Sequence, residues 1–110
     1  MPDPKVFELE KAADAFRQKG EFSAAIEKIT EALKIDEGFV RGHLALAVLY
    51  HNIKEHELAC KHAERACELE PGDTFNYAAL SVTYQRAFEG TQDPAYIQRA
   101  ETAMARSRGM

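Results

Sequence analysis

A shift of 34 positions brings the sequence into register with itself, and this internal repeat is the feature that most restricts the fold. A short unit recurring at fixed spacing cannot bury its apolar side alone, so such chains fold as stacks of similar units sharing one core. In this register apolar residues fall on apolar ones and aromatic residues on aromatic ones. The aligned sets are Ala12 with Leu46 and Leu80, Phe16 with Tyr50 and Tyr84, Ala25 with Ala59, Ala32 with Ala66, Leu33 with Cys67, and Ile35 with Leu69.

The third copy keeps this register through Tyr84 and then slips by three residues. The Gly, Asp and Pro within residues 88–94 are typical of a loop, so we place the three-residue insertion there. We therefore predict one domain over residues 1–110, with repeats at about 6–39, 40–73 and 74–107. After the insertion Cys60 aligns with Ile97, Ala63 with Ala100, Ala66 with Ala103, and Cys67 with Met104.

Each copy contains two stretches whose apolar residues recur at spacings of three and four, which indicates one face of a helix. Asp3-Pro4 and Asp93-Pro94 each offer an Asp cap followed by proline, and Asp73 can cap the helix after Pro71. No segment alternates apolar and polar residues, so we predict an all-α fold without strands. The predicted helices are at about 4–18, 22–35, 39–52, 55–69, 74–88 and 94–107.

Composition limits the classes of partner. The formal net charge is −4 and the basic residues are scattered, which disfavours nucleic acid because phosphate binding needs a concentrated basic face. No run approaches the roughly 18 apolar residues that a membrane span needs, and the first five residues lack the character of a signal peptide. We therefore expect a cytoplasmic protein that has no membrane partner.

The 34-residue helix-turn-helix unit resembles the tetratricopeptide repeat over about residues 4–107. The resemblance implies an all-α, right-handed superhelix of three stacked helix-turn-helix repeats with six helices. The first copy carries Leu9, Ala12, Ala13, Phe16, Gly20, Phe22, Ala25, Ala32 and Ile35 in the order of the family pattern. The second carries Leu46, Ala47, Tyr50, Ala59, Ala66 and Leu69-Glu70-Pro71, and the third carries Tyr77, Leu80, Ser81, Tyr84, Ala100 and Ala103.

Two positions depart from the pattern. Glu37 stands where the second copy has Pro71, so the first turn between repeats lacks a proline stop. Tyr96 stands where the earlier copies have Ala25 and Ala59. A ring at a close-packing position is expected to push the last helix away from its partner.

In tetratricopeptide repeat proteins the first helices of the pairs line a concave groove that commonly binds peptides or helices. The core aromatics occupy other positions, so an apolar strip on this face indicates a binding site. The resemblance implies a partner-binding groove made of Phe7, Arg17, Arg41, Leu44, Val48, His51, Phe75, Val82, Gln85 and Arg86. The family's C-terminal carboxylate clamps use Lys, Asn and Arg at positions that here are Glu10, Asp14, Ala45, Phe75 and Ala79, so this groove is not expected to be a carboxylate clamp.

No catalytic, cofactor or metal site is predicted. His56 and Cys60 have the spacing of metal ligands on one helix face, but Cys60 and Cys67 fall in packing rows, where a thiol acts as a small hydrophobe. The two cysteines lie about 10 Å apart along a helix, too far for a disulfide. There is no Gly-rich phosphate loop and no recognisable Ser/His/Asp arrangement. We expect Glu27, Glu31, Glu64 and Glu68 on solvated outer faces.

Two functions remain open at this point. The first is an adaptor, not an enzyme, whose groove accepts a partner segment with apolar anchors and some acidic residues. The second is a self-assembly module. The sequence lacks the extra polar helix that often closes such arrays, which leaves Ile97 and Met104 of the C-terminal repeat open for another copy.

Overall fold

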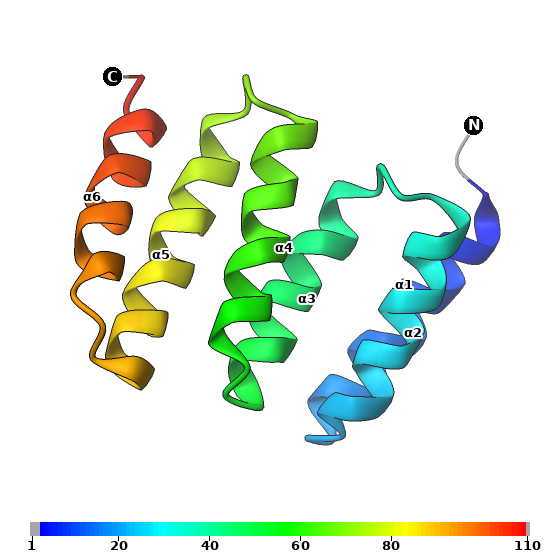
Figure 1. The fold of residues 1–110 in the computed structure, drawn as a ribbon. Helices are drawn as coiled ribbons and strands as arrows, with labels where there is room; N and C mark the ends of the chain where they lie inside the picture. Colours follow the sequence, from blue (N-terminus) through cyan, green and yellow to red (C-terminus); the bar gives the residue numbers. More distant parts are fainter. Residues whose placement is uncertain (1–2, 110) are drawn as a thin grey trace.

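The computed structural model describes residues 3–109, which form six α-helices and no strand (Figure 1). The predicted helix bounds agree within one residue except at the end of the fifth helix, and the all-α prediction is confirmed. The helices are α1 (Pro4–Gln18), α2 (Phe22–Ile35), α3 (Val40–Asn52), α4 (His56–Leu69), α5 (Thr74–Thr91) and α6 (Ala95–Ser107). None of these helices has the length and apolar character needed to cross a membrane.

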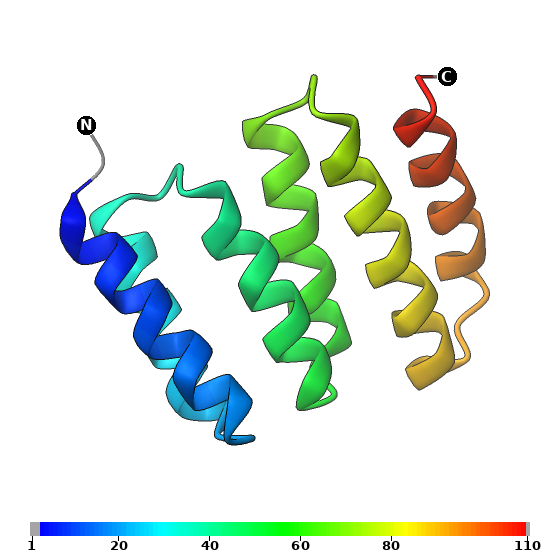
Figure 2. The same cartoon turned by 180° about the vertical axis from the view of Figure 1, so that it is seen from behind.

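Consecutive helices form three hairpins that stand side by side in a row. The first helices of the hairpins, α1, α3 and α5, form one layer and the second helices form another. In Figure 2 α1 and α3 stand in front of α2 and α4, and α5 and α6 are seen side by side. The pairs α1–α2 and α5–α6 therefore lie at opposite ends of the row (Figure 2). Each end has an outer side that no further repeat of the described chain covers.

Side-chain caps fix where three of the helices begin. The Asp3 carboxylate accepts the backbone N–H of Lys5 at 2.8 Å, and the Asp73 carboxylate accepts that of Phe75 at 3.0 Å. Asp93 accepts the N–H of Ala95 at 3.0 Å ahead of α6. These bonds satisfy backbone donors that the first turn of a helix leaves without partners, as the Asp positions in the sequence predicted.

Small residues hold the helices of the stack close together. Ala25, Ala32, Ala63 and Ala66 are fully buried, which is the role that the repeat register assigns to them. A cluster under α5 packs Leu80, Tyr84 and Ala87 of that helix against α3, α4 and α6. Both cysteines are buried free thiols, in agreement with their packing rows, and they belong to this cluster.

The turn between the first two repeats is held by side chains instead of proline. The Asp36 carboxylate accepts the N–H of Gly38 at 3.1 Å, and the Glu37 backbone carbonyl lies 2.9 Å from His43 Nε2. The Glu37 carboxylate forms two hydrogen bonds to Arg65 of α4, at 2.8 and 3.0 Å. Glu37 therefore stabilises this turn through contacts to the second repeat, whereas a proline would end the helix by restricting the backbone.

The predicted loop at residues 88–94 is wrong in its first half, because α5 continues through Thr91. The extra residues therefore lengthen the helix, and the turn is confined to residues 92–94. Gly90 lies against the imidazole of His56, and a Cβ at this position would overlap the ring. The helix ends at Gln92, which adopts a left-handed conformation with φ 62°.

The expectation that Tyr96 forces α6 away from α5 is also wrong. The Ser81 hydroxyl donates a hydrogen bond to the Ala100 carbonyl at 3.0 Å, and Ala100 and Ala103 are buried, so the two helices pack closely. The Tyr96 ring is accommodated at the start of α6, where it stacks on Tyr84 at a centroid distance of 6.1 Å. A position next to the turn leaves a ring more room than a position in the middle of a helix.

Candidate functional site

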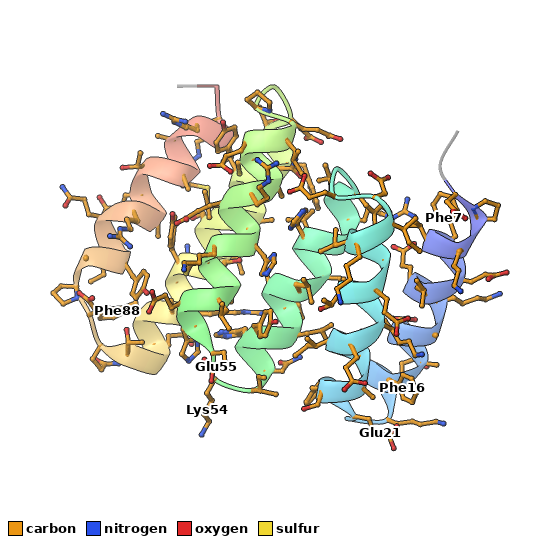
Figure 3. All side chains as sticks on the ribbon, turned by 45° about the vertical axis from the view of Figure 1, so that its right-hand side comes forward. Phe7, Phe16, Glu21, Lys54, Glu55 and Phe88 are labelled. Atoms are coloured by element: carbon orange, nitrogen blue, oxygen red, sulfur yellow. The ribbon has the colours of Figure 1, made fainter. Side chains whose placement is uncertain are left out.

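An apolar strip crosses the layer formed by α1, α3 and α5. Its exposed members are Phe7 (42% exposed), Val48 (43%), Phe75 (69%) and Val82 (43%). Large apolar side chains are seldom this exposed together on one face unless the face binds something. Figure 3 labels Phe7 near the start of α1, at one end of this strip.

The strip contains two hollows that share Val48. The first lies between α1 and α3, has a volume of about 580 Å³ and includes Val48 and Phe7 in its lining. Its apolar lining is completed by Ala13, Ile29, Ala45 and Leu49, and its polar residues are Glu10, Lys11, Asp14 and Arg17. We call this the first hollow.

The second hollow lies between α3 and α5 and has a volume of about 420 Å³. Val48 lines it from one side, and Arg86 and His51 contribute polar atoms. The remaining lining residues are Leu44, Ala47, Phe75, Ala78, Ala79, Val82 and Thr83. The structure thus brings Leu44, Val48, His51, Phe75, Val82 and Arg86 together, and Phe7 and Arg17 line the adjoining first hollow.

Two of the predicted groove arginines already have carboxylate partners. Arg41 forms hydrogen bonds to both oxygens of Glu10, at 2.7 and 2.9 Å, and its guanidinium lies over the Phe7 ring at 5.6 Å. Arg17 contacts Asp14 at 2.6 Å. Arg86 forms no ion pair within residues 3–109, so no carboxylate of the described residues neutralises its charge through direct contact.

His51 stands at the polar end of the second hollow as half of an imidazole pair. Its Nδ1 lies 2.8 Å from Nδ1 of His56, so the two rings can share one N–H hydrogen. Burial lowers the pKa of His51, and the neighbouring His56 and Arg86 lower it further. His51 is therefore uncharged at neutral pH, and the positive charge at this end of the groove comes from Arg86.

Gln85 does not join the other predicted residues. It lines a different cleft, between α5 and α6. Lys11 and Thr83 were missed by the sequence prediction although they line the hollows. Lys11 follows Phe7 by one helical turn, so the helix period was the signal that could have found it.

Glu64 does not lie on a solvated outer face as predicted. It is half-buried and accepts the hydroxyl hydrogen of Tyr84 at an O–O distance of 2.5 Å. Burial, and then this hydrogen bond to a carboxylate, raise the pKa of Tyr84 well above its usual range. The bond joins the second repeat to the third.

The buried thiols are poorly suited to nucleophilic chemistry. Burial raises the pKa of Cys60 to about 11 and that of Cys67 to about 11, so both remain protonated at neutral pH. The two remaining histidines form a second pair, with Nδ1 of His43 and Nδ1 of His62 3.1 Å apart on the opposite side of the layer. Residues 3–109 contain no group of three or more side chains arranged to hold a metal ion.

Comparison with known proteins points to one family. A family model described as "Tetratricopeptide repeat" matches residues 40–73, the range assigned above to the second repeat. The structure is similar to the crystal structure of the Sgt2 TPR domain from Aspergillus fumigatus, with a TM-score of 0.69 and 22% sequence identity. That match covers 96% of this chain and 80% of the other. A search of curated protein sequences found no match.

Proposed function

We propose that this chain is a protein of the tetratricopeptide repeat type and acts as an adaptor that binds a segment of a partner protein in its groove. Proteins of this fold typically act as protein-interaction modules, and the finer assignment to the groove rests on one observation. The exposed apolar side chains of α1, α3 and α5 line two adjoining hollows instead of being scattered. An apolar concave surface edged by a few polar groups is the usual form of a binding site.

The two hollows determine the chemistry that the partner segment needs. An apolar anchor enters the first hollow beside Phe7, and a second enters the other hollow beside Phe75 and Val82. A carboxylate on the segment pairs with Arg86, whose charge no described residue balances. Each buried anchor contributes about 1.5–3 kcal/mol, so two or three anchors give roughly micromolar affinity after the costs of association.

A free C-terminal carboxylate is not the group that this groove recognises. Glu10 and Asp14 place carboxylates at two positions of the first hollow where a clamp needs Lys and Asn, and they neutralise Arg41 and Arg17 by ion pairing. Phe75 and Ala79, at the other positions where a clamp needs cations, are apolar. The proposal therefore specifies an internal segment of the partner. It includes no enzymatic step, and it places the interaction in the cytoplasm, as expected from the sequence.

A selection from a library of displayed peptides tests the proposal. Peptides captured by the folded chain should share two apolar anchors and an acidic residue. Val48→Glu should abolish their binding, because Val48 lines both hollows and a carboxylate there would be desolvated by the peptide. The helical circular dichroism signal should stay unchanged, because Val48 is exposed.

Leu58→Glu is the matched control. Leu58 is an apolar residue of α4, is 37% exposed, compared with 43% for Val48, and receives the same substitution outside the groove. If Leu58→Glu weakens binding as much as Val48→Glu does, the site is not the groove. If Val48→Glu unfolds the chain, Val48 is a core residue and the assignment fails.

Self-assembly through the C-terminal repeat is the second candidate. It is favoured by the exposure of Ile97, an apolar residue at 42% exposure on the outer side of the stack. Size-exclusion chromatography with light scattering measures it directly, since a dimer that Ile97→Glu dissolves would establish self-assembly.

A further inference from the structure

The cleft between α5 and α6, called the end cleft below, is lined by apolar and polar residues in equal number and has a volume of about 640 Å³. It lies outside the groove, on the outer side of the last hairpin. Phe88, labelled in Figure 3, contributes its ring from α5. The other lining residues are Ser81, Gln85, Glu89, Ile97, Ala100, Glu101, Met104, Ala105 and Arg108.

The end cleft repeats, in register, an interface that is occupied inside the protein. α5 packs on α3 and α4 through Ala47, Cys60, Ala63 and Cys67. Their equivalents in the last hairpin are Ser81, Ile97, Ala100 and Met104, and all four line the end cleft. One repeat earlier, the equivalent surface of α3 and α4 is therefore already occupied by α5. The residues that α5 presents there indicate which kind of helix would fit the end cleft.

α5 packs against α3 and α4 through Leu80, Tyr84 and Ala87, which are spaced by four and then three residues. We propose that the end cleft binds an amphipathic helix of a partner protein that carries leucine, tyrosine and alanine at this spacing. Such a helix presents the same apolar face to α5 and α6 as α5 presents to α3 and α4. This site is independent of the groove proposed above.

A carboxylate supports tyrosine at the second position. Inside the protein the Tyr84 hydroxyl donates to Glu64 at 2.5 Å. In the repeat register Glu64 aligns with Glu101, which lines the end cleft and whose carboxylate forms no hydrogen bond or ion pair within the described residues. A tyrosine on the docked helix would supply Glu101 with the hydroxyl donor that Glu64 already has.

Charge favours a basic residue two positions after that tyrosine. In α5 this residue is Arg86, which lines the second hollow together with His51 of the preceding repeat. The equivalent of His51 is Gln85, and Glu89 follows Gln85 by one turn in the lining of the end cleft. A lysine or arginine on the docked helix would therefore lie near an acidic side chain.

A second copy of the chain fits the end cleft poorly. Stacked head to tail, it would present Ala12 and Phe16 of α1, and Lys19 directly after that helix, at the positions of Leu80, Tyr84 and Ala87. Alanine fills less space than leucine, and phenylalanine offers Glu101 no hydroxyl. Ala87 is fully buried, so a lysine at its position would lose its hydration without a partner, which is costly.

The test uses a fluorescent peptide with the sequence of residues 74–91, held helical by a lactam bridge on the face opposite Leu80 and Tyr84, titrated into the full chain. We expect saturable anisotropy. Replacing the peptide's tyrosine with phenylalanine should weaken binding about tenfold, the usual effect of losing a hydrogen bond to a charged group. Against Glu101→Ala, an exposed position on α6, the two peptides should bind equally.

Two further variants locate the bound peptide. Ile97→Glu should weaken binding at least tenfold, whereas Val48→Glu should leave it unchanged, so failure of this proposal can be told from failure of the groove. The proposal is overturned if no saturable binding occurs, or if Val48→Glu is the damaging change. It is also overturned if the two peptides keep their difference against Glu101→Ala, or if light scattering shows a dimer that Ile97→Glu dissolves.

Discussion

The hydrogen bond between Tyr84 and Glu64 offers the sharpest test of how the repeats are joined. Tyr84→Phe removes the hydroxyl and keeps the ring, so it leaves no cavity in the cluster under α5. The change therefore isolates one polar contact between α4 and α5. It also tests the contact from which the chemistry of the end cleft was inferred.

Burial and charge determine the size of the effect. Hydrogen bonds to charged groups contribute about 1.5–3 kcal/mol, and the half-buried carboxylate of Glu64 keeps some hydration, which favours the lower end of that range. We expect Tyr84→Phe to lower the free energy of unfolding by about 1.5 kcal/mol. With a urea m-value of about 1.5 kcal/mol/M, the midpoint should fall by about 1 M.

A double-mutant cycle measured by urea denaturation isolates the pair. In the Glu64→Ala background, Tyr84→Phe should lower the free energy of unfolding by less than about 0.5 kcal/mol. The carboxylate acceptor is already absent there, and water can accept the hydrogen bond of the Tyr84 hydroxyl. Equal costs in the two backgrounds would refute the coupling. That result would also remove the reason for placing a tyrosine beside Glu101.

Three other outcomes are expected. The two cysteines should react slowly with a thiol reagent at pH 8 and quickly in denaturant, because burial raises the pKa of each to about 11 and blocks access. Because the pKa values of His51 and His62 are lowered in the folded protein, the unfolded chain takes up protons first as the pH falls. The free energy of unfolding, measured by urea titrations at several pH values, should therefore fall as the pH drops below about 6.5. Ala25→Leu should destabilise the protein by about 1–3 kcal/mol in thermal melts, because Ala25 is fully buried, whereas Ala15→Leu at an exposed position of α1 should have little effect.

Much of the fold could be predicted because the repeat fixes the close-packing positions. A register that places Ala63 on Ala100 and Ala66 on Ala103 determines which faces of α4 and α6 turn inward, and all four alanines are buried. The end of α5 could not be predicted in this way. Gly90 has the composition of a loop residue, and only the imidazole of His56 against it shows why a helix with glycine at that point is favourable.

The candidate groove was predicted less completely for a similar reason. Helix period identifies which residues share a face, but not which charges meet across repeats. Glu10 and Arg41 are 31 positions apart, and their pairing depends on how the first two hairpins are rotated against each other. Glu64 was placed on an outer face because periodicity does not show that the hydroxyl of Tyr84 reaches it.

The two proposed surfaces differ in how their ligands can be inferred. Within the described chain the groove has no occupied counterpart, so its partner can be inferred only from exposed side chains and from Arg86. The end cleft does have an occupied counterpart, because in a repeat protein each hairpin packs against the first helix of the next hairpin. The end cleft contains apolar residues at three of the four positions that are apolar in this counterpart. Glu101 lies at the position of Glu64 and provides a carboxylate there.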